Sequence, residues 1–529
     1  MTRMAATYAE PGVSSPDHGE LARIRARLLR PLPDDRLWGW LLPLAVTAVG
    51  ALLRFWHLGT PKGVVFDEVY YEHDAWSLLH HGVELDKNSH DQTAGFIVHP
   101  PIGKWMIAVG EAIFGHNAVG WRFSAAVVGS LAILMVARIG RRLFRSTFLG
   151  CVAGLLLAFD GLEFVQSRTA MLDIFLMFWV LAAFGCLVID RDDGRRRLAH
   201  RLDGPIGERL GPWLGVRPWR IACAVCLGLA MATKWDGVFW LPLFVVLMLF
   251  WDAGARRVGG AAHPFGGALV LDELAAGALF VVVPLAVYIA SWTGWFASDG
   301  VHAYDHDRYV LAGQSWLAHD WAVFRGWLTY HHEIYDFHKS LDSPHPYLSR
   351  PAGWLLLVRP VAYYYSSPHG CGAADCSQEV LGVGTPALWY ATIPALVFTC
   401  WRWVASRDWR AAALALTFLV GYLPWFIEDA HHRTMFLFYL LPAVPFMALM
   451  VTLTIGSLLG QAWQETRRIV GSVAVGAYLI LVIANFAWLR PVLAGDVITY
   501  NQWHHRMMFT TCDQTKHRNE HHENAPCWI

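Results

Sequence analysis

Eleven apolar segments, separated by polar or charged stretches, constrain the fold of this 529-residue chain more than any other feature. Most are roughly 15 to 23 residues long, and a helix of about 20 residues spans the core of a bilayer. The segments are 38–56, 119–137, 147–159, 170–189, 221–233, 237–251, 273–292, 382–400, 411–427, 435–456 and 469–488. We therefore predict an all-α polytopic membrane protein with about eleven transmembrane helices. The segments 147–159 and 221–233 are short, which a tilt or a break in the helix would explain.

The composition supports a membrane location. Charged residues make up 16% of the chain, whereas soluble domains carry about 25%. The 27 tryptophans suit the aromatic belts of membrane interfaces. The formal net charge of zero argues against nucleic acid as a partner. Residues 1–37 lack the short apolar core of a cleavable signal peptide, so we expect 38–56 to be a retained anchor.

The distribution of Lys and Arg predicts the orientation in the membrane. With a cytoplasmic N-terminus, 25 of these residues fall in cytoplasmic segments and 15 in outer ones, and every Lys falls outside. Cytoplasmic loops of membrane proteins are enriched in positive charge. We therefore expect a cytoplasmic tail over 1–37, a transmembrane domain over 38–490 and an outer tail over 491–529. The protein is expected to reside in the cell membrane.

Two outer loops are large. The first, 57–118, contains the apolar stretch 102–114, which is too short to span and suits a helix that lies in the interface or re-enters the membrane. The second, 293–381, is rich in Trp, Tyr and His. Because it has few strand-like runs, we do not expect an inserted β-rich domain there.

Four of the nine cysteines fall in predicted outer segments, where an oxidising compartment permits disulfides. Proximity in the chain alone suggests the pairs Cys371–Cys376 and Cys512–Cys527. Reduced or cross-paired thiols remain the alternative. The other five cysteines lie in or beside apolar segments.

Ionisable side chains gather at the predicted outer ends of the apolar segments, where they are costly and usually functional. They are Asp67, Glu68, His99, Lys104, Arg122, Asp160, Glu163, Arg168, Asp173, Lys234, Asp236, Glu428, Asp429, His431, His432 and Arg433. Cations from five separate segments suit a lipid-linked phosphate, and the carboxylates suit a general base. A membrane enzyme with a lipid-phosphate donor fits both features.

Simpler interpretations exist for several of these residues. Adjacent acids in a loop, such as Asp67 and Glu68, are usually solvated surface. Arg122 and Arg168 could extend to the interface merely to reach water. The C-terminal histidines lack the close spacing of a zinc site, so we expect no metal there; they are His504, His505, His517, His521 and His522.

The chain resembles the bacterial protein O-mannosyltransferase family. The matching stretches are Phe66-Asp67-Glu68-Val69-Tyr70-Tyr71, His99-Pro100-Pro101-Ile102-Gly103-Lys104, Gly120-Trp121-Arg122-Phe123, Ser167 through Asp173, Thr233-Lys234-Trp235, His345-Pro346-Tyr347, Ser349, Pro351, Trp354, Tyr422 through Trp425, and Arg433 through Pro442. They run in the family's order over about residues 38 to 490, and their combination is more specific than any one of them.

The resemblance implies a GT-C type membrane glycosyltransferase. Such enzymes transfer mannose from a polyprenyl-phosphate donor to Ser or Thr hydroxyls of secreted proteins at the outer face of the membrane. The implied partners are this donor, the protein acceptors, membrane lipids and the protein secretion machinery. Eukaryotic members carry an inserted β-trefoil domain, for which the second outer loop is too short, so the basis of acceptor selection does not carry over.

The family reaction inverts the anomeric centre, so one displacement with one base is expected. Asp67 is our candidate base, although the sequence does not separate it decisively from Glu68, which we expect to orient the sugar or to pair with a basic residue. Asp173 is expected to hold Arg168 in place.

The remaining site residues are assigned by chemistry. The donor phosphate and lipid are expected to contact Arg122, Lys234, Arg168, Arg433 and Lys104. The sugar or acceptor is expected to lie against His99, His345, Tyr347 and Trp354. The chemistry requires no cofactor, although some GT-C enzymes use a divalent metal and this alternative stays open.

Two other classes of function compete with this interpretation. A related GT-C enzyme would share the acids and cations but transfer its sugar to a glycan or lipid acceptor. A transporter or flippase would place ionisable residues near the middle of the bilayer and show an inverted repeat. No repeat is visible in the sequence, and the charges gather at one face.

Overall fold

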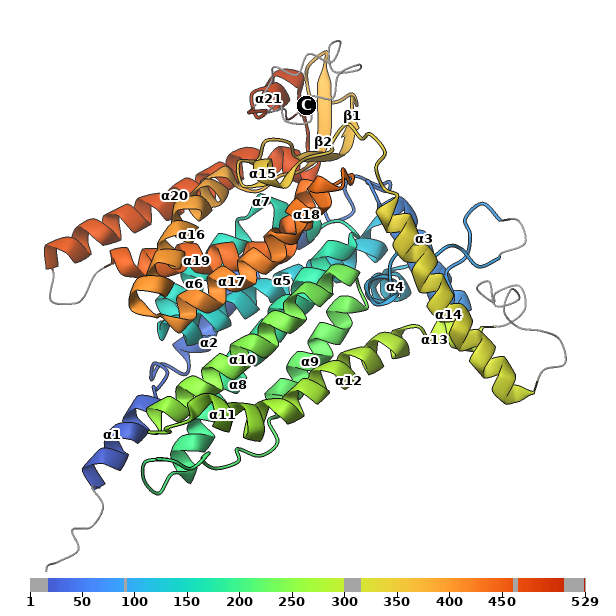
Figure 1. The fold of residues 1–529 in the computed structure, drawn as a ribbon. Helices are drawn as coiled ribbons and strands as arrows, with labels where there is room; N and C mark the ends of the chain where they lie inside the picture. Colours follow the sequence, from blue (N-terminus) through green and yellow to red (C-terminus); the bar gives the residue numbers. More distant parts are fainter. Residues whose placement is uncertain (1–17, 90–92, 299–314, 460–464, 509–527, 529) are drawn as a thin grey trace, which may run out of the picture.

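Long helices form the body of the molecule in this computed structural model (Figure 1). The structure describes residues 18–89, 93–298, 315–459, 465–508 and 528. Within these ranges, eight helical segments are long and apolar enough to cross a membrane. They are α2 (Trp38–Phe55), α5 (Ala118–Phe144), α8 (Leu172–Arg201), Trp235–Val258 with α10 (Trp240–Val258), Pro264–Ser291 with α12 (Leu274–Ser291), Trp409–Ala430 with α17 (Trp409–Tyr422) and α18 (Pro424–Ala430), Leu437–Leu458 with α19 (Val444–Leu458), and Ile469–Ala494 within α20 (Glu465–Ala494).

Three further helices account for the remaining apolar segments. These are α6 (Thr147–Ala158), α9 (Pro218–Met231) and α16 (Pro386–Ser406). Each of the eleven predicted segments therefore overlaps a helix. The predicted number of crossings is not confirmed, because eight segments, not eleven, meet both the length and the apolarity of a span in the described part of the chain.

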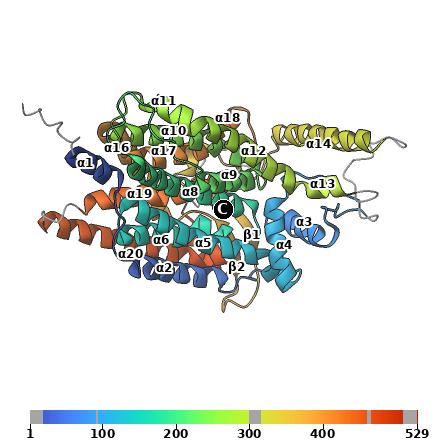
Figure 2. The ribbon, with the colours of Figure 1, turned by 90° about the horizontal axis from the view of Figure 1, so that it is seen from below.

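The central helices of the bundle are buried by their neighbours, and the outer helices expose apolar side chains. In Leu437–Leu458, 89% of an 18-residue apolar stretch is buried, whereas the corresponding share is 22% in α2 and in α20. Figure 2 shows α8 in the middle of the bundle, with α2 on one side and the α10–α12 helices on the other. The outer helices expose large apolar side chains such as Leu52 and Val473, which suits contact with acyl chains rather than water.

Two helices from the first large loop pack side by side at one end of the bundle (Figures 1 and 2). The interfacial helix predicted over 102–114 is present as α4 (Ile102–Phe114). The other helix, α3 (Glu68–His81), was not predicted from the sequence. It ends at Gly82, whose φ of 75° is left-handed and whose N–H donates to the Leu78 carbonyl, as is common after a helix.

The second large loop contains a long helix and a hairpin. Helix α14 (Trp316–Lys339) projects from the same end of the bundle as α3 (Figure 1). Strand β1 (Val361–Ser366) pairs antiparallel with β2 (Cys376–Gly382), which pairs antiparallel with β3 (Val497–Thr499) near the C-terminus. This small sheet departs from the all-α prediction. As expected, no β-rich domain is present in the part of the loop that the structure describes.

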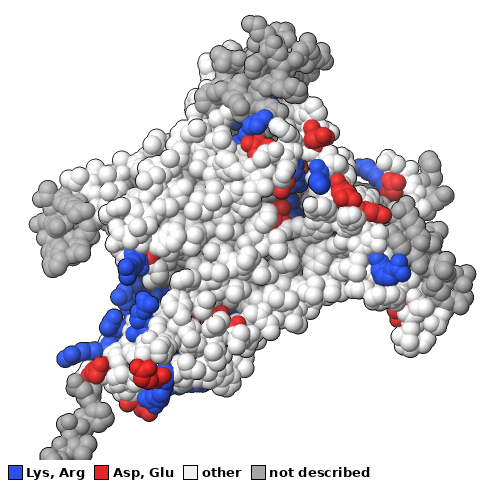
Figure 3. All heavy atoms as spheres, in the orientation of Figure 1, with Lys and Arg blue, Asp and Glu red and all other residues white. Residues whose placement is uncertain are grey.

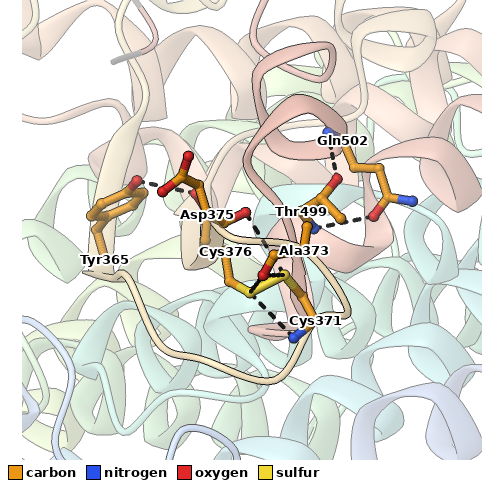
Figure 4. Close-up of a disulfide and its surroundings, with 8 residues drawn as sticks. Tyr365, Cys371, Ala373, Asp375, Cys376, Thr499 and Gln502 are labelled. Carbon is orange, nitrogen blue, oxygen red and sulfur yellow. Dashed lines mark hydrogen bonds between the residues drawn. A yellow bond between two sulfur atoms is a disulfide. The ribbon is translucent and has the colours of Figure 1, made fainter.

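A disulfide closes the connection between β1 and β2 (Figure 4). It joins Cys371 to Cys376, whose Cα atoms are 5.8 Å apart, and this is the pairing suggested by proximity in the sequence. Beside it, the hydroxyl groups of Tyr365 and Ser377 share a hydrogen bond of 3.1 Å across the two strands. Cys512 and the other half of its predicted pair lie outside the described residues.

Charged side chains gather at opposite ends of the molecule, with a broad uncharged belt between them (Figure 3). At the end of α1 (His18–Leu28), a cavity of about 670 Å³ is rich in arginine. Its arginines are Arg27, Arg30, Arg142, Arg145, Arg191, Arg195, Arg196 and Arg410. At the end of α3 and α14, acids and bases are mixed (Figure 3). This arrangement matches two aqueous faces separated by a membrane.

Candidate functional site

The position of Asp67 is fixed by the residue before it. Phe66 has a φ of 47°, a left-handed conformation that is uncommon for a residue with a side chain. Its N–H donates to the Tyr363 carbonyl at 3.1 Å, and its ring stacks on that of Tyr363 with centroids 5.1 Å apart. A strained residue persists only where its surroundings hold it. These contacts therefore set the direction in which Asp67 leads into α3.

The Asp67 carboxylate is half-buried and makes no hydrogen bond or ion pair with any residue that the structure describes. Burial raises the pKa of Asp67 from 3.8 to about 6; the positive charge of Lys234 opposes this shift, and the negative charge of Asp173 adds to it. Asp67 is therefore largely ionised at neutral pH and more basic than an ordinary Asp, as a general base requires.

Lys234 carries the positive charge that acts on the Asp67 carboxylate. It follows α9 in the chain, and its Nζ lies 3.0 Å from Oδ1 of Asp173 and 4.9 Å from the ring centroid of Tyr439. Our expectation that Asp173 holds Arg168 is wrong, because Asp173 pairs with Lys234 instead. A single ion pair leaves Lys234 with donors for a further anion.

Arg433 lies near the same group of residues. Its charge acts on His99, as does that of Lys234. Its contact with Glu428 is long, at 3.8 Å, and its Nε has no hydrogen-bond partner in the described structure. Among the expected phosphate contacts, Lys234 and Arg433 therefore retain the capacity to bind an anion.

Arg122 and Glu68 form a saturated pair instead. The Arg122 Nε and Nη2 atoms donate to the two carboxylate oxygens of Glu68 at 2.8 and 2.7 Å. The remaining Arg122 donors reach the backbone carbonyls of Leu58, Pro61 and Gly63. With both side chains buried and five contacts for five donors, Arg122 has nothing left for a phosphate. Glu68 pairs with a basic residue, which is one of the two roles we expected.

Arg168 and Lys104 are similarly occupied. Arg168 donates to the carbonyls of Arg54 and Trp56 at 2.7 Å each, so it satisfies the end of α2, whose last carbonyls lack helical partners. Lys104 is buried and bridges Asp74 at 2.9 Å and Glu84 at 3.2 Å. Both cations therefore fasten elements around the site.

Among the residues expected at the sugar or acceptor, the two histidines contact aromatic residues that flank Asp67 in the chain. Burial lowers the pKa of His99 well below 6.5, and the charge of Lys234 lowers it further, so this imidazole is neutral. The ring of His345 contacts Phe66 and Phe436 at centroid distances of 6.2 and 4.9 Å. Both histidines therefore pack near the start of α3, which follows Asp67.

The two remaining residues of that set differ from each other. Tyr347 is half-buried, and its N–H donates to Nδ1 of His345 at 3.1 Å. Trp354 is fully buried, and its Nε1 donates to the Ser349 hydroxyl at 2.9 Å. Trp354 therefore belongs to the packed core and offers no surface to a ligand.

Sequence reasoning missed three neighbours of the site. Tyr439 lies under the Lys234 ammonium. Tyr71 lies one turn of α3 beyond Asp67, and His338 of α14 lies beside His99 with ring centroids 5.1 Å apart. Tyr71 and Tyr439 fall within stretches that carry the family resemblance, which was the available signal. His338 had none, because α14 was not predicted.

The sequence matches known families along most of its length. Residues 44–293 match the family described as dolichyl-phosphate-mannose-protein mannosyltransferase, and residues 323–512 match the C-terminal four TMM region of protein-O-mannosyltransferase. The chain is 42% identical over 484 residues to the polyprenol-phosphate-mannose–protein mannosyltransferase of Mycolicibacterium smegmatis (strain MKD8), covering 89% of this chain and 92% of that protein. It is 34% identical to the protein of the same name from Corynebacterium glutamicum, covering 91% and 96%.

Solved structures support the same fold. The S. cerevisiae protein O-mannosyltransferase Pmt1–Pmt2 complex bound to the sugar donor aligns with a TM-score of 0.66 at 15% identity, over 91% of this chain and 92% of the yeast chain. The Archaeoglobus fulgidus oligosaccharyltransferase aligns with a TM-score of 0.53 at 13% identity, over 87% and 57%. At these identities the likeness concerns the fold alone. By its sequence and its GT-C fold, this chain belongs to the polyprenol-phosphate-mannose–protein mannosyltransferases, a family of multi-pass membrane glycosyltransferases.

Proposed function

We propose that this enzyme transfers mannose from a polyprenyl-phosphate donor to Ser or Thr hydroxyls of secreted proteins, with inversion at the anomeric carbon. The observation that carries the proposal is the Asp67 carboxylate, half-buried and without a partner among the described residues, in the surroundings of Lys234. The sequence relatives are named polyprenol-phosphate-mannose–protein mannosyltransferases, which supports the proposal.

In the proposed step, Asp67 accepts the proton of the acceptor hydroxyl. At the same time the oxygen of that hydroxyl forms a bond to the anomeric carbon. The bond from that carbon to the phosphate oxygen breaks, and the phosphate leaves with both electrons. Lys234 and Arg433 supply the positive charge that stabilises the departing phosphate. We propose that these two cations make a cofactor unnecessary for the transfer itself.

The surrounding residues position this step. Glu68 and Arg122 join the start of α3 to α5, so that Asp67 is held at a fixed place on the bundle. His99, which is neutral, packs beside Tyr71, and His345 packs beside Phe66; both are proposed to contact the sugar or the acceptor. Positioning of this kind matters because a displacement of about 1 Å can lower a rate about 100-fold.

We further propose that the end of the bundle that carries α3 and α14 faces outward from the cell membrane. The disulfide Cys371–Cys376 belongs to a loop whose sheet lies apart from the arginine-rich end near α1 (Figures 1 and 3). Disulfides persist in oxidising compartments, and arginine is enriched on the cytoplasmic side. An outward site would receive proteins as they leave the secretion machinery, which we propose as a functional partner.

A membrane assay tests the proposed reaction. Membranes containing this protein, a labelled mannosyl polyprenyl phosphate and a Ser/Thr-rich peptide should yield labelled peptide. Asp67→Asn should lower the rate by about 100-fold or more, the range of general base catalysis. Label on glycan or lipid but not on peptide would favour the related GT-C function. An Asp67→Asn rate above a tenth of wild type would eliminate Asp67 as the base.

A further inference from the structure

A cluster of metal-ligand side chains lies outside the site around Asp67. It consists of Glu72 on α3, Glu111 on α4 and His116 in the connection that follows α4. One ligand atom from each lies within 4.8 Å of the other two. The three residues come from positions separated by up to 44 places in the chain, so the packing of α3 against α4 creates the cluster.

Glu111 is the member of the cluster whose burial most needs an explanation. The residue is only 1% exposed, and neither carboxylate oxygen has a hydrogen-bond partner in the described structure. Burial and the neighbouring charge of Glu72 raise the pKa of Glu111 to about 8. Buried carboxylates are normally paired, hydrogen-bonded or coordinated to a metal ion.

His116 is oriented toward both carboxylates. Its Nε2 lies within hydrogen-bond reach of Oε2 of Glu72 and 3.7 Å from Oε1 of Glu111. Its ring stacks on Trp76 of α3, with centroids 4.8 Å apart, which fixes the plane of the imidazole. Lys87 approaches the other oxygen of Glu72, at 3.6 Å, so Oε2 faces the cluster.

We propose that Glu72, Glu111 and His116 bind one divalent transition-metal ion, with zinc as the preferred ion. One imidazole nitrogen and two carboxylate oxygens are a donor set that zinc accepts in tetrahedral sites, with water completing the fourth position. Calcium and magnesium sites are built mainly from oxygen ligands. The charges of the two carboxylates balance that of the ion, which removes the cost of burying Glu111 uncompensated.

The ion would join α3 to the end of α4. Since α3 begins directly after Asp67, this link would help to fix the helix from which the candidate base projects. The ligands touch neither Lys234 nor Arg433, so the metal acts on position and not on the transferred sugar. The binding of metal therefore does not depend on whether the proposed reaction is correct.

Metal content of the full-length protein tests the proposal. The protein is purified in detergent, incubated with zinc sulfate, passed over a desalting column and analysed by elemental mass spectrometry. Wild type should retain about one zinc ion per chain, and His116→Ala and Glu111→Gln less than about a tenth of that. The control is Glu208→Gln with His263→Ala, an exposed pair 3.3 Å apart that lies outside the cluster; it should retain as much zinc as wild type.

A spectroscopic measurement guards against loss of metal by misfolding. Cobalt(II) added to wild type should give visible absorption bands that His116→Ala lacks, and zinc should raise the melting temperature of wild type but not that of His116→Ala. His116 is exposed, so this variant is expected to fold. Wild type that retains no zinc, or His116→Ala that retains as much as the control, would overturn the proposal.

Discussion

Asp67 and Glu68 are neighbours in the chain but occupy opposite electrostatic settings. Glu68 accepts hydrogen bonds from Arg122 and from the backbone N–H groups of Val65 and Ala170. The Asp67 carboxylate accepts none from the described residues. The sequence could not distinguish the two acids, because two of the three partners of Glu68, Arg122 on α5 and Ala170 before α8, lie more than 50 positions away.

The raised pKa of Asp67 predicts an acidic limb in the pH dependence of the rate. A general base must be ionised, so the rate should fall below about pH 6 and approach a tenfold loss per pH unit. Initial rates of mannose transfer between pH 4.5 and 8 measure this, with the intact donor quantified at each pH as a control. A rate that stays constant down to pH 5 would contradict a base with this pKa.

The same pKa predicts that the candidate base destabilises the fold at neutral pH. The folded state binds a proton at Asp67 more tightly than the unfolded state, whose Asp has a pKa near 3.8. The stability from this group is therefore present below pH 3.8 and lost as the pH rises through 6. Asp67→Asn should melt at a higher temperature than wild type at pH 7.5, and the difference should shrink as the pH approaches 4.

Arg433 and Arg122 should respond differently to substitution. Arg433→Ala removes a loosely paired cation and should lower kcat/KM for the donor by roughly 10- to 100-fold with a near-normal melting temperature. Arg122→Ala leaves Glu68 buried without its partner, at a cost of about 3–5 kcal/mol. Its melting temperature should fall while the donor KM of the folded fraction stays unchanged. The reverse pattern would restore Arg122 as a phosphate contact.

At the scale of elements, apolar periodicity predicted the bundle but not the structures at its ends. Length and hydropathy identify the eleven apolar runs and the 13-residue α4 in the sequence. Helices α3 and α14 carry many acids and histidines, so no continuous apolar run marks them. The sheet pairs Cys376 with Thr499, and a contact this distant in the chain leaves no local signal.

The hairpin that carries β1 and β2 gives a prediction at this scale. The Cys371–Cys376 disulfide closes a short loop, and the loss of such a constraint costs about 2 kcal/mol in the chain-entropy account. Cys371→Ser with Cys376→Ser should make the loop more sensitive to proteases under native conditions, while the rate of transfer changes less than about twofold. The matched control is Cys400→Ser, a free cysteine on α16.

At the scale of the whole molecule, the two polar ends differ in kind. One end is dominated by arginines around the cavity near α1, and the other mixes acidic and basic side chains near α3 and α14 (Figure 3). Arginine counts in the sequence anticipated this asymmetry. The partners of individual cations could not be predicted, because Arg122 and Arg168 donate hydrogen bonds to backbone carbonyls that only the folded chain brings to them.

The asymmetry predicts which positions can be reached from outside the cell. His332 lies exposed on α14, and Glu208 lies exposed in the connection between α8 and α9. A membrane-impermeant maleimide should label His332→Cys in intact cells, and Glu208→Cys only after permeabilisation, because arginine-rich segments stay in the cytoplasm. The parent chain, whose unpaired described cysteines lie on helices of the bundle, supplies the background. Labelling of Glu208→Cys but not His332→Cys in intact cells would invert the proposed orientation and place the Asp67 site on the cytoplasmic side.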